Sequence, residues 1–135
     1  MIDLASPEQA VQAIMVPALL LLGLSHIVRP ALWRDFFNHL HSLGTTGVVT
    51  RTFAFELWPA LLIMVFHQVW SGPGIALTIY GWLLMTKVTL SLLVPELGLK
   101  SLAMADAVTD ARWAVAGLLL IALSASSLWS LLSAL

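Results

Sequence analysis

Long apolar stretches separated by short polar segments dominate the chain. Lys, Arg, Asp and Glu are absent from three stretches, residues 9–28, 57–86 and 113–135. The middle stretch is interrupted by Ser71–Gly74, whose Ser, Gly and Pro residues are typical of a turn. Because a membrane-spanning helix needs about 20 predominantly apolar residues, the pattern predicts four spanning helices. Their expected ranges are 8–28, 48–70, 75–95 and 110–133.

The first connection has a different pattern, that of an amphipathic helix. After Pro30, apolar residues recur at three-to-four spacing and polar residues fill the positions between them. The apolar positions are Leu32, Trp33, Phe36, Phe37, Leu40 and Leu43, and the polar ones are Arg34, Asp35, Asn38, His39 and His41. We therefore expect an interfacial helix over residues 31–43, lying in the plane of the membrane surface. Residues 95–102 are a shorter counterpart in the third connection.

Composition agrees with this pattern and excludes several classes of protein. The chain is 60% hydrophobic and 10% charged, with a mean hydropathy of +0.97, whereas soluble domains are typically about 45–50% apolar and about 25% charged. A soluble enzyme, a nucleic-acid-binding protein and a disordered chain are thereby excluded. The absence of Cys excludes disulfides, thiolate metal sites and cysteine nucleophiles. We predict an all-α polytopic membrane protein of one domain, residues 1–135, with four transmembrane helices.

The positive charges predict an orientation. All six Lys and Arg residues lie in or beside the first and third connections, namely Arg29, Arg34, Arg51, Lys87, Lys100 and Arg112. Because cytoplasmic segments carry the excess of Lys and Arg, we expect these two connections in the cytoplasm. Both termini and the 70–74 turn are then expected on the outer side of the membrane.

A weak internal repeat appears when the sequence is shifted by 61 positions. Ser25-His26 then falls on Thr86-Lys87, and Arg51 falls on Arg112. Half-repeats over residues 8–70 and 71–133 would form a duplicated helical hairpin. Each half contains two spans, so the halves would be related by a twofold axis along the membrane normal.

Two charges lie inside the predicted spans, Glu56 in the second and Lys87 in the third. A charge near the centre of a spanning helix costs about 2.5–3.5 kcal/mol on insertion scales, and a pair facing each other would offset much of that cost. We expect such a buried polar pair at similar depths on adjacent helices. It is either a structural ion pair that fixes the helix register or a site that binds a proton or a substrate.

Other polar residues are expected near the same membrane face. His26, Arg51 and Arg112 lie near the inner ends of three helices, and with Asp110 they form a candidate cytoplasmic pocket beside the buried pair. Thr109 or Asp110 is also a suitable N-cap of the fourth helix. Arg51 and Arg112 are alternatively anchors for phospholipid headgroups.

The sequence provides no catalytic residues and no expected cofactor or metal. The four His residues have neither the spacing nor the placement for a shared haem or metal ion, and no HExxH, CxxCH or GxSxG motif occurs. Small residues near the end of the fourth helix, Ala122, Ser124, Ala125, Ser126 and Ser127, suit a close contact with another helix. That helix lies either in the same bundle or in another subunit.

Several short segments resemble small uncharacterised bacterial inner-membrane proteins with four helices. The segments are Gly23–His26 with Arg29-Pro30 and Phe36-Phe37, and Phe66–Gly72 with Thr78, Gly81-Trp82, Lys87 and Pro95. The second half alone resembles short two-helix inner-membrane hairpins. The resemblance implies a bacterial inner membrane and no assigned activity.

Three functions are compatible with these observations. The first is a non-enzymatic accessory or assembly subunit that packs with itself as a homo-oligomer or with a larger membrane complex. The second is a small dimeric transporter or channel that uses a protonatable pocket of Glu56, Lys87 and His26. The third, an enzyme acting on a lipid or quinone, has the least support. A dry, closed ion pair at Glu56 would favour the first function, and a wet cavity reaching Glu56 the second or third.

Overall fold

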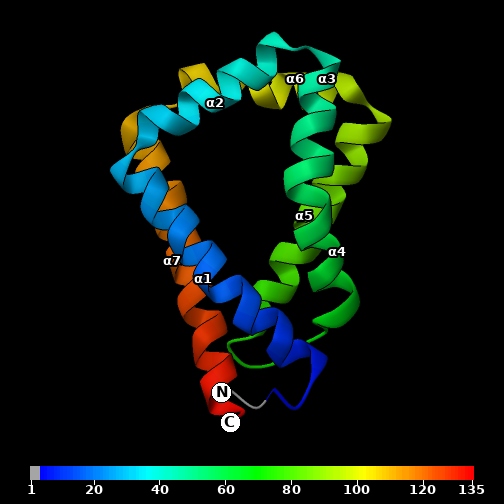
Figure 1. Ribbon diagram of the computed structural model, residues 1–135, viewed down its shortest axis with the longest axis vertical. Coiled ribbons are helices and arrows are strands. Elements are labelled where there is room, and N and C mark those ends of the chain that lie inside the picture. The colour runs from blue at the N-terminus through cyan, green and yellow to red at the C-terminus, as the bar shows by residue number, and fades with distance from the viewer. Residues whose placement is uncertain (1–3) are drawn as a thin grey trace.

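The computed structural model describes residues 4–135, which form helices joined by short turns (Figure 1). In chain order the elements are α1 (Pro7–Val28), α2 (Pro30–Ser42), α3 (Thr45–Val49), the π-helix η1 (Thr50–Glu56), α4 (Leu57–Phe66), α5 (Ile75–Leu93), α6 (Pro95–Ala103), the 3₁₀-helix η2 (Met104–Ala107) and α7 (Asp110–Ser133). No β-strand occurs within residues 4–135. The predicted all-α class is confirmed.

Four segments are long and apolar enough to span a membrane. Three of them are the single helices α1, α5 and α7. The other, the second span, is the continuous helix Thr45–Phe66, which α3, η1 and α4 form together. The chain is therefore an integral membrane protein with four candidate spans, as predicted. Four boundaries differ from the prediction: the first span begins one residue earlier, the second begins at Thr45 instead of residue 48, and the second and third end earlier than predicted. The second span ends before residue 70 because the backbone leaves the helix at His67, with φ −121° and ψ 82°. The third ends at Leu93 because Pro95 disfavours the helical conformation of Val94.

Side-chain caps fix where the first and last spans begin. Ser6 accepts a hydrogen bond from the backbone N–H of Gln9, and Pro7 occupies the first turn of α1. Thr109 in the same way accepts from the N–H of Arg112 at the start of α7. Thr109, not Asp110, is therefore the N-cap residue of the fourth span.

The spans form two helix pairs, α1 with α7 and the second span with α5 (Figure 1). Small residues allow α1 and α7 to approach closely, since a Cβ atom on Gly23 would lie 2.6 Å from the carbonyl oxygen of Gly117. Farther along this contact, Ser124 donates a hydrogen bond to the carbonyl oxygen of Val16 at 2.7 Å. This side of the predicted small-residue patch on α7 thus packs inside the bundle. Each pair joins a helix from one predicted half-repeat to a helix from the other, and the duplication itself stays a prediction.

The short helices α2 and α6 cross one end of the bundle, opposite the end where α1 begins and α7 terminates (Figure 1). Leu40 on α2, Val48 on α3 and Leu102 on α6 form a small buried core there. The amphipathic helix predicted for residues 31–43 is thus present as α2. Its Phe36 and Phe37 pack against this core, and its His41 is exposed.

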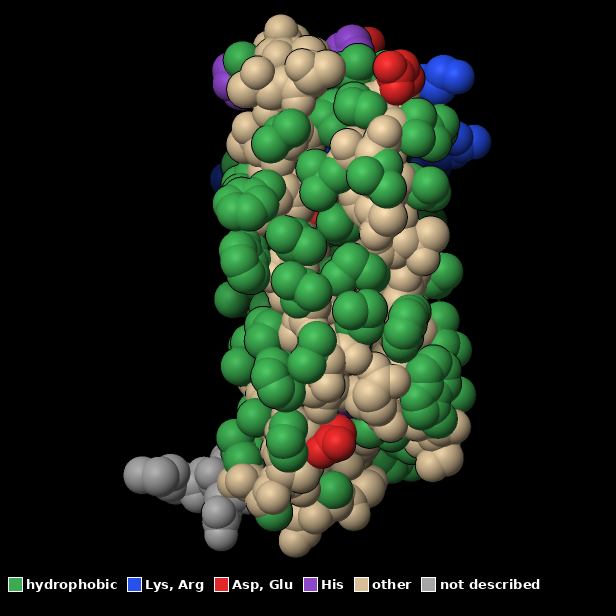
Figure 2. Space-filling view, turned by 90° about the vertical axis from the view of Figure 1, so that its right-hand side faces the viewer, with side chains coloured by type: hydrophobic (Ala, Val, Ile, Leu, Met, Phe, Trp, Pro, Cys, Tyr) green, Lys and Arg blue, Asp and Glu red, His purple; other side chains and the backbone are tan. Residues whose placement is uncertain are grey.

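The outer surface is mainly apolar, as a bilayer requires. Hydrophobic side chains cover the middle of the face shown in Figure 2, whereas Lys, Arg and His gather at the end formed by α2 and α6. Large exposed apolar residues occur on all four spans, for example Leu21, Phe53, Leu83 and Leu119. The charged connections and the apolar band therefore divide the molecule as expected for a transmembrane bundle.

Candidate functional site

An open cavity of about 910 Å³ lies between the two helix pairs, below the layer formed by α2. Its walls are mostly apolar, and they come from α1, α2, the second span and α5, with one residue from α7. Five polar or charged side chains also line it: His26, Arg51, Glu56, Tyr80 and Lys87. Concave, largely apolar cavities with a few polar groups are the usual form of small-molecule sites in proteins.

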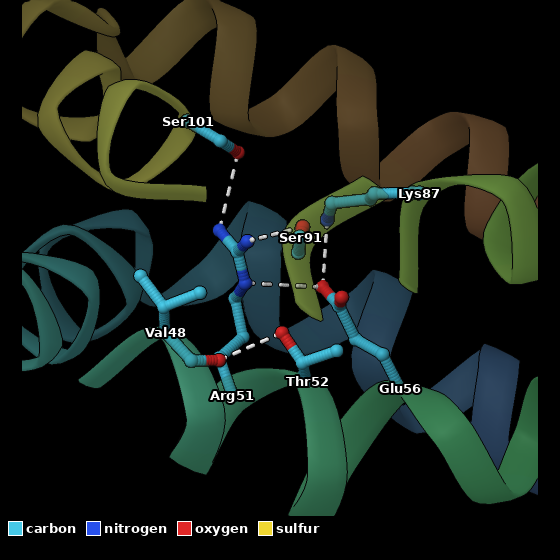
Figure 3. A network of polar contacts seen from close by, with 7 residues as sticks. All are labelled: Val48, Arg51, Thr52, Glu56, Lys87, Ser91 and Ser101. Atoms are coloured by element: carbon cyan, nitrogen blue, oxygen red, sulfur yellow. Dashed lines mark hydrogen bonds and ion pairs between the residues drawn. The ribbon is translucent and has the colours of Figure 1, made fainter. Parts of the chain in front are cut away.

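Glu56 and Lys87 meet at the wall of this cavity. Lys87 Nζ lies 2.6 Å from Glu56 Oε1, so η1 and α5 are joined by a direct ion pair (Figure 3). The Glu56 side chain is 12% exposed and the Lys87 side chain 44% exposed. The structure thus brings together the two charges that the sequence places inside the spans.

Arg51 is a third member of the same cluster. Its Nε lies 3.5 Å from Glu56 Oε1, and its side chain is only 3% exposed. Its terminal nitrogens donate hydrogen bonds to Ser101 Oγ at 3.1 Å and Ser91 Oγ at 3.4 Å (Figure 3). One carboxylate therefore faces two cations, and the cluster carries a surplus of one positive charge.

The π-helical turn η1 explains how Arg51 reaches Glu56. In an α-helix, side chains five positions apart point about 140° away from each other. A π-helix bonds residue i to residue i+5, which places such residues on one face, and π-turns often occur at functional sites. The ion pair between Arg51 and Glu56 follows from this local geometry.

One oxygen of the cluster has no partner. Glu56 Oε2 is buried and accepts no hydrogen bond from the described residues. Leaving a buried acceptor unsatisfied costs about 1–3 kcal/mol, and more for a charged group. The carboxylate therefore has unused capacity to accept a hydrogen bond.

Aromatic side chains form the end of the cavity nearest α2. His26 stacks on Trp33 with ring centroids 4.3 Å apart, and Trp33 contacts both Phe36 and Phe37. His26 Nδ1 lies 2.7 Å from the carbonyl oxygen of Leu22. Because a carbonyl only accepts, Nδ1 carries a proton and donates it in a hydrogen bond to Leu22.

Two members of the predicted pocket need correction. Arg112 and Asp110 do not line the cavity. Both are exposed in the first turn of α7, where Asp110 forms an ion pair with Arg34 of α2. The prediction grouped them with His26 and Arg51 because all four residues lie at similar depths in the membrane. The rotation of α7 about its axis turns a different face of this helix toward the cavity.

A second buried polar network lies at the opposite end of the bundle and was missed in the sequence. His67, which is fully buried in the connection between α4 and α5, lies between Gln12 Nε2 at 2.9 Å and Thr78 Oγ1 at 3.0 Å. Gln12 Nε2 also donates to Ser130 Oγ at 2.9 Å, and Thr78 donates to the carbonyl oxygen of Val69 at 2.8 Å. The network ties α1, α5 and α7 to the end of α4. Its members are uncharged, so the charge map contained no signal for it.

The protonation state of His67 follows from its partners. An amide nitrogen only donates, so His67 Nε2 accepts from Gln12 and Nδ1–H donates to Thr78. Burial lowers the pKa of this imidazole from the ordinary value of 6.5, against smaller opposing effects of a backbone hydrogen bond and of Glu8. His67 is therefore neutral at pH 7.

Comparison of the chain with models of protein families, with curated proteins and with solved structures gives no match. Within residues 4–135, no three His, Asp or Glu side chains are grouped so that they could hold a metal ion. The cavity, with its mostly apolar walls and its charged cluster, suits a molecule that combines an apolar body with a polar head.

We predict unequal effects of removing the two charges of the pair. Glu56→Gln should destabilise the protein more than Lys87→Met, because it leaves the buried guanidinium of Arg51 without a carboxylate. Breaking a buried ion pair in this way costs about 3–5 kcal/mol, whereas Lys87→Met leaves Arg51 paired. Unfolding in detergent followed by tryptophan fluorescence measures the difference.

The exposed residues of α6 provide matched controls, since Glu96→Gln and Lys100→Met should change the free energy of unfolding little. An equal or larger loss of stability in Lys87→Met than in Glu56→Gln would contradict a shared carboxylate.

We also predict that acid weakens the bundle through His67. Because burial lowers the pKa of the folded imidazole, the unfolded chain binds the proton first as the pH falls below 6.5, and stability is lost. The melting temperature in detergent should therefore fall between about pH 7.5 and about pH 5.5.

The exposed His41 provides the matched control for this measurement. His41→Gln should keep the pH dependence of the wild type, and His67→Gln should reduce it. A slope that is unchanged in His67→Gln would assign the pH effect to another group.

Proposed function

We propose that this integral membrane protein is a small transporter that holds an amphipathic molecule in the cavity between its two helix pairs. The observation that carries the proposal is the open cavity that reaches Glu56 and its two cations. A subunit that only fixes the register of its helices needs a closed ion pair and no cavity. A role as an accessory or assembly subunit, alone or in a homo-oligomer, is the second candidate and has no comparable support.

The two ends of the cavity differ in a way that suits transport. At the end near the termini, the network around His67 joins the helices, and the helices are packed closely there. Toward α2 the helix pairs diverge, and the cavity lies between them (Figure 1). Rocking of one pair against the other would alternate access to the cavity.

The membrane and the orientation are part of this proposal. We propose a bacterial inner membrane, with α2 and α6 on the cytoplasmic side and both termini outside. The support is the gathering of Lys and Arg at the α2 and α6 end, together with the positive-inside rule.

A cavity-filling substitution tests whether a molecule is bound. Ala18 lines the cavity on α1, so Ala18→Phe should exclude the bound molecule by occupying its space. Mass spectrometry of the small molecules and lipids that co-purify in mild detergent should show one species at near-stoichiometric amount with the wild type and its loss in the variant.

Ala122→Phe, on the exposed side of α7, is the matched control and should keep the bound species. If the wild type and Ala18→Phe carry the same molecules in the same amounts, the cavity is not a binding site.

Single-cysteine labelling tests the orientation, because the wild type has no Cys. Ser71→Cys, exposed at the terminal end, should react with an impermeant thiol reagent in intact cells. Thr45→Cys, exposed at the α2 end, should react only after the cells are opened. Labelling of Thr45→Cys from outside would reverse the proposed orientation.

A further inference from the structure

The polar groups in the cavity specify the chemistry of its ligand more narrowly. We propose that the ligand is an amphiphile whose head carries one negative charge and a hydroxyl group, as in a glycerol phosphodiester lipid. This inference rests on the proposed function, because it requires that the cavity binds a molecule.

The first argument is charge balance. Arg51 and Lys87 contribute two positive charges to the cavity and Glu56 one negative charge. No Asp and no second Glu lines the cavity among residues 4–135. An unbalanced charge is costly beside apolar walls because little water solvates it. One negative charge on the ligand makes the site neutral, whereas a cation would increase the imbalance.

The second argument is hydrogen bonding at the carboxylate. Glu56 Oε2 is buried without a donor, and both nearby cations approach the other oxygen, Oε1. Oε2 itself has almost no accessible surface, so a hydroxyl group on the ligand can donate to it only when the Glu56 side chain, which lines the cavity, turns this oxygen toward it. An anionic head without a donor would neutralise the charge but leave this oxygen unsatisfied and repel it.

The third argument is the availability of Lys87. An ammonium group has three N–H donors, and the structure uses one of them for Glu56. Its side chain is 44% exposed and lines the cavity, so the remaining donors are accessible to an anionic oxygen. Arg51, in contrast, is enclosed by Ser91, Ser101 and Glu56.

The fourth argument is the polarity gradient along the cavity. The charge cluster lies less than two turns from the end of α5, near the α2 and α6 layer. Deeper walls are formed mainly by apolar side chains such as Met15, Leu19 and Leu120, with Tyr80 as the polar exception. A lipid would therefore enter with its head toward α2 and α6 and its chain toward the bilayer centre, as lipids are oriented in a leaflet.

Three lipids that differ only in the head test this inference. Dioleoyl phosphatidylglycerol has one negative charge and hydroxyl groups, dioleoyl phosphatidylethanol has the same charge without a hydroxyl, and dioleoyl phosphatidylcholine has no net charge. Native mass spectrometry of the purified protein titrated with each lipid should give affinities in that order. Equal affinity for the first and third lipid would overturn the charge argument, and equal affinity for the first two would overturn the hydrogen-bonding argument.

Variants separate the cavity from the charged surface. Losing a charge-assisted hydrogen bond typically corresponds to a loss of affinity of about tenfold, so Lys87→Met should bind phosphatidylglycerol about tenfold more weakly. Lys100→Met, which removes an exposed charge on α6, should bind it like the wild type. Equal losses in both variants would show headgroup binding at the surface only and would overturn the inference.

Ala18→Phe distinguishes failure of the inference from failure of the proposed function. If the wild type binds all three lipids equally and Ala18→Phe blocks that binding, the cavity is a binding site but the proposed head chemistry is overturned. Unchanged binding of every lipid, with no co-purifying species lost from this variant, would overturn both.

Discussion

The carboxylate of Glu56 is the group on which the arrangement at the cavity depends. It lies between Lys87 on α5 and Arg51 on its own helix, and it is the only acid that lines the cavity among the described residues. Arg51 in turn contacts Ser91 of α5 and Ser101 of α6. Through one buried negative charge, the second span, α5 and the α6 layer are held in a fixed relation. Since charges in an apolar environment must be paired, this relation cannot change without a new partner.

The two polar networks differ in chemistry and in the helices that they join. The charged cluster connects the second span to α5 and α6 and leaves the α1–α7 pair apart, with the cavity between the pairs. The neutral network around His67 brings α1 and α7 together with α5 at the opposite end. The molecule is therefore joined across both pairs at one end and open between them near the other. A ligand that replaces or bridges partners in the charged cluster would bind where a buried carboxylate oxygen lacks a hydrogen-bond partner.

Much of the fold could be predicted because its physical causes are local. The absence of charge over about 20 residues is sufficient to indicate a spanning helix, and the three-to-four spacing in residues 31–43 is sufficient for α2. The pairing of Glu56 with Lys87 was predicted from depth, since two isolated charges in apolar helices need each other. The sequence predicts Arg51 in the pocket but not in the pair. In an α-helix, a residue five positions from Glu56 would point about 140° away from it. The π-turn at Thr50–Glu56 has no recognisable signal in the residues that form it.

The sequence by itself determined the membrane environment, the four spans and the end of the bundle that carries the positive charges. These properties depend on composition and on order along the chain. Only the tertiary structure decided how the helices are rotated and paired. That rotation turned Arg112 and Asp110 away from the cavity, joined Gln12 to His67 and Ser130, and opened a cavity beside Glu56. Helix rotation is set by contacts between residues far apart in sequence, such as the approach of Gly23 to Gly117, and no single segment of the chain contains that information.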